Sequence, residues 1–80
     1  MMTAETLSER IARLPDNIRA EIARRHTTIE IVVEQMTDCS RATFMRRMRR
    51  PGKFTIGNIV DLARILNVRP SVLLDWNGER

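Results

Sequence analysis

The sequence predicts an all-α protein, a compact bundle of about five short helices in one domain that spans residues 1–80. A chain of 80 residues buries only about 60% of its unfolded surface, so we expect one modest core and no second domain. Leu, Ile, Val and Met dominate the apolar residues, whereas aromatics are limited to two Phe and one Trp. This composition favours helices packed through aliphatic side chains.

The first segment, residues 1–26, carries a helical stripe that a proline interrupts. Its apolar residues recur at spacings of four, three, four and four, at Leu7, Ile11, Leu14, Ile18 and Ile22. Proline is tolerated in the first turn of a helix but costs about 3 kcal/mol in its interior. Because of Pro15, we expect one short helix to end near Leu14 and a second to begin there. A single kinked helix is the alternative.

A capping motif predicts the start of the next helix. Thr27 and Glu30 fit the pattern Ser/Thr-x-x-Glu, in which each side chain bonds to the backbone of the other residue. The helix is therefore expected from about Thr28. Its β-branched run could be mistaken for a strand, but Gln35 and Met36 extend a helix comfortably.

The segment "TDCS" breaks this helix, since Thr, Asp and Ser side chains bond readily to nearby backbone. Ser40 is expected to cap a further helix from Arg41 to about Arg50, which the following Pro-Gly pair ends. Residues 27–50 are thus predicted to form a helix, a short turn and a helix.

Two supporting helices are expected in residues 55–76. Thr55 suits the cap of the first, which should end at Asn67, a residue that tolerates a left-handed closing conformation. Pro70 suits the first position of a last short helix that carries Trp76.

The excess positive charge of the chain lies in one stretch. The formal net charge is +4, yet six basic residues and no Asp or Glu lie between Cys39 and Val60, and the remainder is net negative. Binding a polyanion requires such a concentration, because each contact with a phosphate releases condensed counterions. An ordinary solvated charged face is the alternative.

The helix predicted at 41–50 would separate an apolar face from an arginine-rich face. Its core-facing residues would be Phe44, Met45 and Met48. The opposite face would present Arg41, Ala42, Arg46 and Arg49, with Thr43, Arg47 and Arg50 on the flanks. An arginine-rich helix of about 15 Å matches what the major groove of B-DNA admits. Arginine bonds guanine through two hydrogen bonds, and Ala42 or Thr43 can touch a thymine methyl group.

The stretch "TIEIVVEQMTDCSRATFMRRMRRPGKFTIGNIVDLARILNVRPSVLL" resembles the Cro and lambda-repressor-like helix-turn-helix family. "SRATF" is similar to the start of the family's recognition helix, and "IVDLARILNVRPSVLL" is similar to its closing helices. The resemblance covers a little over half the chain. Two departures are Val33 and Glu34, where the family has a small residue, and Asp38, where it usually has Gly.

The resemblance implies a sequence-specific transcriptional regulator of duplex DNA, of the Cro repressor type, from a bacterium or a phage. Matching positions, together with the place of Thr43 on the helix, give the expected base-reading residues Ser40, Arg41, Ala42, Thr43 and Arg46. The expected phosphate-binding residues are Thr28, Arg47, Arg49, Arg50 and Lys53.

The implied partner is double-stranded DNA, and proteins of this kind commonly bind as homodimers. Two recognition helices would then meet half-sites roughly 34 Å apart, so the operator is expected to be an approximate inverted repeat. Candidate interface residues are Leu7, Ile11, Leu73 and Trp76, each equally suited to the core. The sequence leaves the oligomeric state open.

Other classes of function are less well supported. An antitoxin-type or other protein-interaction module could use the same scaffold to bind a protein partner. RNA binding is disfavoured because few aromatics remain for base stacking. No enzyme activity, cofactor or metal site is expected, since Cys39 and His26 stand alone and the glycines are isolated. The chain shows neither a secretory leader nor a long apolar run, so a cytoplasmic location without a membrane partner is expected.

Overall fold

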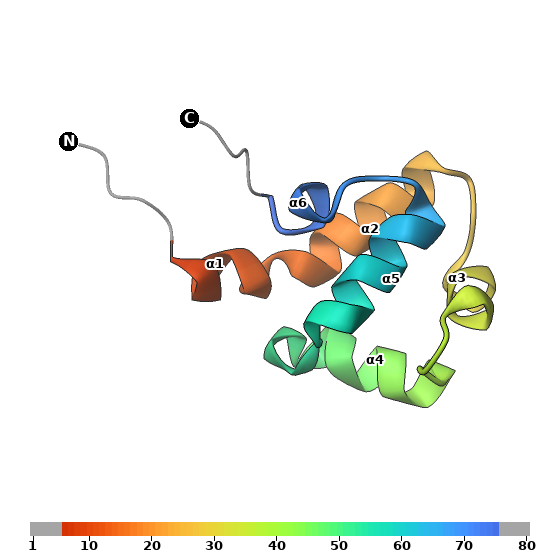
Figure 1. Cartoon of the computed structure of the whole chain (residues 1–80), viewed down its shortest axis with the longest axis horizontal. Helices are drawn as coiled ribbons and strands as arrows, with labels where there is room; N and C mark the ends of the chain where they lie inside the picture. Colours follow the sequence, from red (N-terminus) through yellow and green to blue (C-terminus); the bar gives the residue numbers. More distant parts are fainter. Residues whose placement is uncertain (1–5, 76–80) are drawn as a thin grey trace.

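The computed structural model describes residues 6–75, in which six α-helices and one 3-10 helix occur and no strand (Figure 1). The elements are α1 (Leu7–Ala12), α2 (Leu14–Arg24), α3 (Ile29–Gln35), α4 (Arg41–Arg49), the 3-10 helix η1 (Pro51–Lys53), α5 (Ile56–Leu66) and α6 (Pro70–Leu73). The all-α prediction is confirmed, with one α-helix more than the about five expected. Trp76 lies outside the described residues.

The break predicted at Pro15 is confirmed, and a single residue separates α1 from α2. Pro15 lies in the first turn of α2, where its missing N–H leaves no hydrogen bond unmade. Arg13 keeps right-handed backbone angles, φ −90° and ψ −5°, so the two helices follow one another with only a bend between them (Figure 1). The apolar stripe is buried from Leu14 onward, whereas Leu7 is 54% exposed.

The predicted capping box of Thr27 with Glu30 is wrong, because Thr27 belongs to the closure of α2. His26 has a left-handed φ of 54°, and the N–H groups of His26 and Thr27 both return to carbonyls of the last turn of α2 at 3.1 Å. Because Thr27 takes part in this Schellman motif, α3 begins one residue later than the capping box predicts. Thr28 is the cap instead, and its hydroxyl accepts a hydrogen bond from the Ile31 N–H at 3.2 Å. The helical interpretation of the β-branched run is confirmed.

Ser40 caps α4 as predicted, and its hydroxyl accepts a hydrogen bond from the Thr43 N–H at 3.2 Å. The helix ends at Arg49, one residue earlier than expected, since Arg50 leaves the helical region with φ −130° and ψ 75°. No residue of the turn before α4 has a left-handed backbone, so Asp38 needs none of the conformational freedom of glycine.

Both closing helices begin as predicted, but α6 ends at Leu73, earlier than expected, because Asp75 has a left-handed backbone with φ 56°. Thr55 caps α5, and Asn67 ends it in the left-handed region, with φ 57° and ψ 46°. Pro70 occupies the first turn of α6. None of the helices in residues 6–75 is long and apolar enough to cross a membrane.

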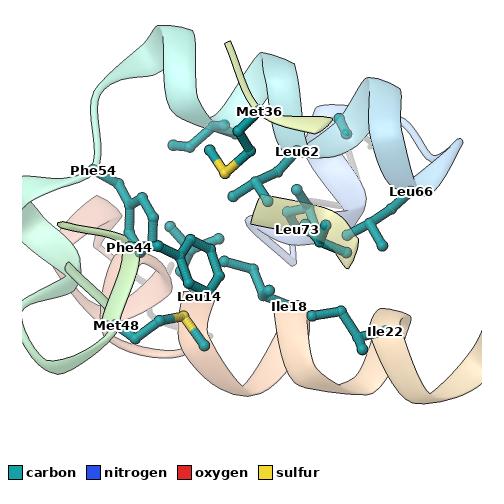
Figure 2. Packing of buried hydrophobic residues seen from close by; sticks show 13 residues of the cluster. Leu14, Ile18, Ile22, Met36, Phe44, Met48, Phe54, Leu62, Leu66 and Leu73 are labelled. Atoms are coloured by element: carbon teal, nitrogen blue, oxygen red, sulfur yellow. The ribbon is translucent and has the colours of Figure 1, made fainter. Parts of the chain in front are cut away.

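The core lies between α2, α4 and α5, with α6 closing one end (Figure 2). Its largest fully buried side chains are Phe44, Leu14, Ile18, Leu62, Leu66, Leu73 and Val32. Leu73 is therefore a core residue and does not reach the surface as an interface residue would. Phe44 meets Phe54 edge to face, with ring centroids 6.0 Å apart and an interplanar angle of 69°. With Met48 beside them, these contacts fix which face of α4 points outward (Figure 2).

The turn between α3 and α4 is tied to α5 by one carboxylate. The N–H and the hydroxyl of Thr37 both donate to Oδ2 of Asp61, at 2.9 and 3.3 Å, and Arg64 donates to Oδ1 at 2.5 Å. The Thr37 N–H, followed by Arg64, lowers the pKa of the Asp61 carboxyl below its ordinary value. The turn that precedes α4 is thus held by hydrogen bonds to α5.

The C-terminal part of the described chain contacts the beginning of α2. The side-chain amide of Asn17 donates to the Leu73 carbonyl at 2.8 Å, and the Arg13 guanidinium pairs with the Asp75 carboxylate at 3.0 Å. These contacts hold α6 against the start of α2 (Figure 1).

Candidate functional site

The exposed side of α4 and η1 encloses an open hollow of about 570 Å³ that no acidic residue of the described chain lines. Its lining, which we call the basic hollow, consists of Thr43, Arg46, Arg47, Arg49, Arg50 and Lys53. Among the described residues, none of these cations forms an ion pair with a carboxylate. The positive charge of the hollow is therefore uncompensated within residues 6–75, and such a charge attracts anions.

Local helix geometry explains why the cations gather at this end of α4. Arg46, Arg47 and Arg49 lie in its last turn, where positive charge interacts favourably with the negative end of the helix dipole. Arg50 then breaks the helix, and η1 turns the chain so that Lys53 lies beside the same end, with its N–H donating to the Arg50 carbonyl at 2.8 Å.

Three of the predicted base-reading residues form one chain of hydrogen bonds along α4. The Ser40 hydroxyl donates to the Thr43 hydroxyl at 3.0 Å, which also accepts a hydrogen bond from the Arg46 guanidinium at 3.3 Å. Ala42 is exposed beside them. Small groups, Ser40, Ala42 and Thr43, are therefore presented at the start of α4, and the Arg46 side chain is held toward them.

Arg41, a fourth predicted base-reading residue, pairs with Glu30 at the start of α3. Its Nε and Nη2 donate to the same oxygen, Oε2, at 3.1 and 2.9 Å. Both side chains are about 60% exposed, so water screens the pair. The pKa of the Glu30 carboxyl is lowered, first by its own backbone N–H and then by Arg41. Arg41 thus lies outside the basic hollow.

Arg47 is held by Asn58 of α5, a contact that the sequence analysis missed. The Asn58 amide oxygen accepts a hydrogen bond from Nη1 of Arg47 at 2.6 Å and one from the Thr55 N–H at 3.1 Å. Asn58 is 9% exposed, so Arg47 is fixed to a buried group. The spacing of Thr55 and Asn58 is that of a capping box, but no pattern in the sequence indicates that an arginine joins it.

The structure divides the predicted phosphate-binding residues into two groups. Arg47, Arg49, Arg50 and Lys53 line the basic hollow. Thr28 lies apart from it, exposed at the start of α3, where its hydroxyl is engaged with the backbone. The N-terminus of α3 is therefore separate from the basic hollow, whereas the start of α4 reaches the hollow through Thr43.

Other reactive groups are sparse in the described chain. The Cys39 thiol is half-buried, and burial raises its pKa above the ordinary value. Within residues 6–75 no three side chains of His, Cys, Asp or Glu lie together as a metal site would require. A comparison with protein families, curated proteins and solved structures finds no match to this chain.

Proposed function

We propose that this protein is a sequence-specific regulator that binds double-stranded DNA and places α4 in the major groove, in the manner of a Cro-type repressor. The observation that carries the proposal is the basic hollow, a set of cations with no acidic residue of 6–75 among them, on the exposed side of a helix whose other side is anchored in the core. A fixed helix with unpaired cations can approach the DNA backbone in one defined orientation.

The dimensions and the chemistry of α4 suit this role. Its nine residues give a length of about 14 Å, comparable with the groove of B-DNA, which is about 12 Å wide. In the proposed orientation the small side chains of Ala42 and Thr43 allow the start of α4 to approach the bases. Arg46 and, once released from Glu30, Arg41 would donate to guanine O6 and N7.

Arg47, Arg49, Arg50 and Lys53 would neutralise phosphates on the flanking backbone, and Thr28 at the start of α3 would contact a further phosphate. With α3 as the supporting helix and α4 as the recognition helix, the two form the proposed helix-turn-helix. A homodimer would place two such units on an approximate inverted repeat, with half-sites one helical turn apart.

The test is fluorescence anisotropy of the protein with duplex DNA from its own upstream region and with a scrambled duplex, across a series of salt concentrations. We expect a preference of about a thousandfold or more for the native duplex and an affinity that falls steeply as salt rises. Equal and weak binding to both duplexes would contradict sequence-specific reading. A protein partner with an acidic surface, as in an antitoxin-type module, would then be the leading hypothesis.

A further inference from the structure

Asn58 and Arg47 lie on different helices and meet at the edge of the basic hollow. The Asn58 Oδ1 atom faces two donors, the Arg47 guanidinium at 2.6 Å and the Thr55 N–H at 3.1 Å. Because both neighbours are donors, the amide must present its oxygen to them and not its nitrogen. The Asn58 N–H returns to the Thr55 hydroxyl at 3.0 Å, so the acceptor is itself held on both sides.

We infer that Asn58 is a positioning residue for phosphate binding, which holds the Arg47 guanidinium at the edge of the hollow before a phosphate arrives. The inference rests on the proposed function, whose phosphate contacts it deepens. A free arginine loses many rotamers when it binds, whereas a prepositioned one has already lost them on folding. One nitrogen of Arg47 is bound to Asn58, and the other donors of its planar fork remain for phosphate oxygens.

Arg47 differs in this respect from its neighbours in the hollow. Within the described part of the chain, the side chains of Arg49, Arg50 and Lys53 have no hydrogen-bond partner, and all three are exposed. Arg47 is half-buried and bound to a buried amide. Among these four cations, Arg47 is therefore the one that the folded protein holds in place by a side-chain hydrogen bond.

A double-mutant cycle of Arg47→Ala, Asn58→Ala and the double variant, measured by anisotropy on duplex DNA, tests this role. Arg47→Ala should reduce the slope of log affinity against log salt concentration by about one, the change expected when one phosphate contact is lost. Asn58→Ala should weaken binding by about two- to tenfold in the wild-type background, since Arg47 must then be ordered during binding. In the Arg47→Ala background it should have no effect. Equal losses in both backgrounds would overturn the inference.

Thr55→Ala is the matched control for damage to the start of α5. It removes the hydroxyl that caps the helix, so it should lower the melting temperature as Asn58→Ala does. It leaves the bond between Arg47 and Asn58 in place, so the folded variant should keep the DNA affinity of the wild type. If Thr55→Ala weakens DNA binding as much as Asn58→Ala, the effect belongs to α5 and the positioning role is wrong.

A second ligand separates this inference from the proposed function. Inorganic pyrophosphate offers the same phosphate chemistry without a duplex, and isothermal titration calorimetry measures its binding to all four proteins of the cycle. Suppose that the protein binds no duplex, but that Asn58→Ala weakens pyrophosphate binding only when Arg47 is present. The DNA-binding proposal would then fail, and the positioning role of Asn58 would be supported. If the protein binds DNA specifically, but the effects of Arg47→Ala and Asn58→Ala on the binding of both ligands simply add, the DNA-binding proposal would stand and the positioning role would be overturned.

Discussion

The guanidinium of Arg41 lies against the carboxylate of Glu30, with its Nε and Nη2 atoms 3.1 and 2.9 Å from Oε2. The pair joins the first residue of α4 to the first turn of α3. A cation at this end of α4 faces the positive end of the helix dipole, and the carboxylate offsets that unfavourable charge. Within residues 6–75, no other arginine of α4 is paired with a carboxylate.

Glu30→Gln should release Arg41 and remove a negative charge from the proposed DNA-facing surface. We expect tighter binding to all duplexes. The slope of log affinity against log salt concentration should become steeper by up to about one, as for one additional phosphate contact. The melting temperature should hardly change because the pair is exposed. The control is Glu34→Gln, at an exposed position four residues along the same helix. An identical salt dependence in both variants would show that Glu30 does not restrain Arg41.

Arg46→Ala and Arg50→Ala should separate base reading from backbone contact. Arg46→Ala should cost about 1 to 3 kcal/mol on a specific site and flatten the preference at one or two base positions. Arg50→Ala should weaken binding to all sequences alike. Anisotropy on a panel of single-base operator variants measures both effects, and a uniform loss in both variants would contradict direct base reading by Arg46.

Phe44→Ala should remove the side chain that anchors α4 to the core. Phe44 is fully buried against Phe54, so the substitution should cost about 3 to 5 kcal/mol, a large part of the total stability of a small domain. Met45→Ala, at a partly buried position of the same helix, should cost less. Thermal unfolding followed by circular dichroism compares the two, and an unchanged melting temperature for Phe44→Ala would refute its anchoring role.

His26→Gly should stabilise the protein by roughly 0.5 to 1 kcal/mol. The left-handed backbone of His26, with φ 54°, brings its Cβ close to the following carbonyl, and glycine has no such contact. The control is Asn67→Gly, which should change stability less because asparagine tolerates this conformation better. Urea unfolding at neutral pH measures both, and a lower midpoint for His26→Gly would contradict this account of the turn.

The bonds of Asp61 should make part of the stability depend on pH. Its pKa is lowered in the folded state, so its contribution is complete above the unfolded value of about 3.9 and is lost as the pH falls through the lower folded value. Asp61→Asn should cost about 1 kcal/mol at pH 7, and its difference from the wild type should shrink below pH ~4. Urea midpoints from pH 7 to pH 2 measure this, with Asp38→Asn, at an exposed position, as the control. A difference that stays constant with pH would contradict the contribution of Asp61.

Helix ends with a local signal could be predicted from the sequence. Ser40, Asn67 and Pro70 each act within one turn of their own position, so residue type and spacing were sufficient. Thr27 and Thr28 both have a hydroxyl that could cap α3. Which of them does so depends on the left-handed backbone of His26, which the presence of a histidine does not predict.

The partners of the arginines could not be predicted. Arg41 and Glu30 are eleven residues apart on different helices, as are Arg47 and Asn58. Their meeting depends on how α4 packs against its neighbours, which periodicity within one helix does not contain. The sequence did indicate that the stretch is basic, but the hollow itself requires the turn that η1 makes after Arg50.

The contacts of Arg13 and Asn17 with Asp75 and Leu73 bear on how this protein is made. The apolar side of α2 leaves the ribosome before α6, the helix that closes one end of it. Until α6 has been synthesised, Leu14 and Ile18 lack part of the core that packs around them, including Leu73. Contacts between such distant parts of a chain form only after the residues between them have been synthesised, so the nascent chain exposes this apolar surface until α6 has emerged. A ribosome stalled before the codon for Pro70 would therefore hold a chain that chaperones bind in preference to the folded domain.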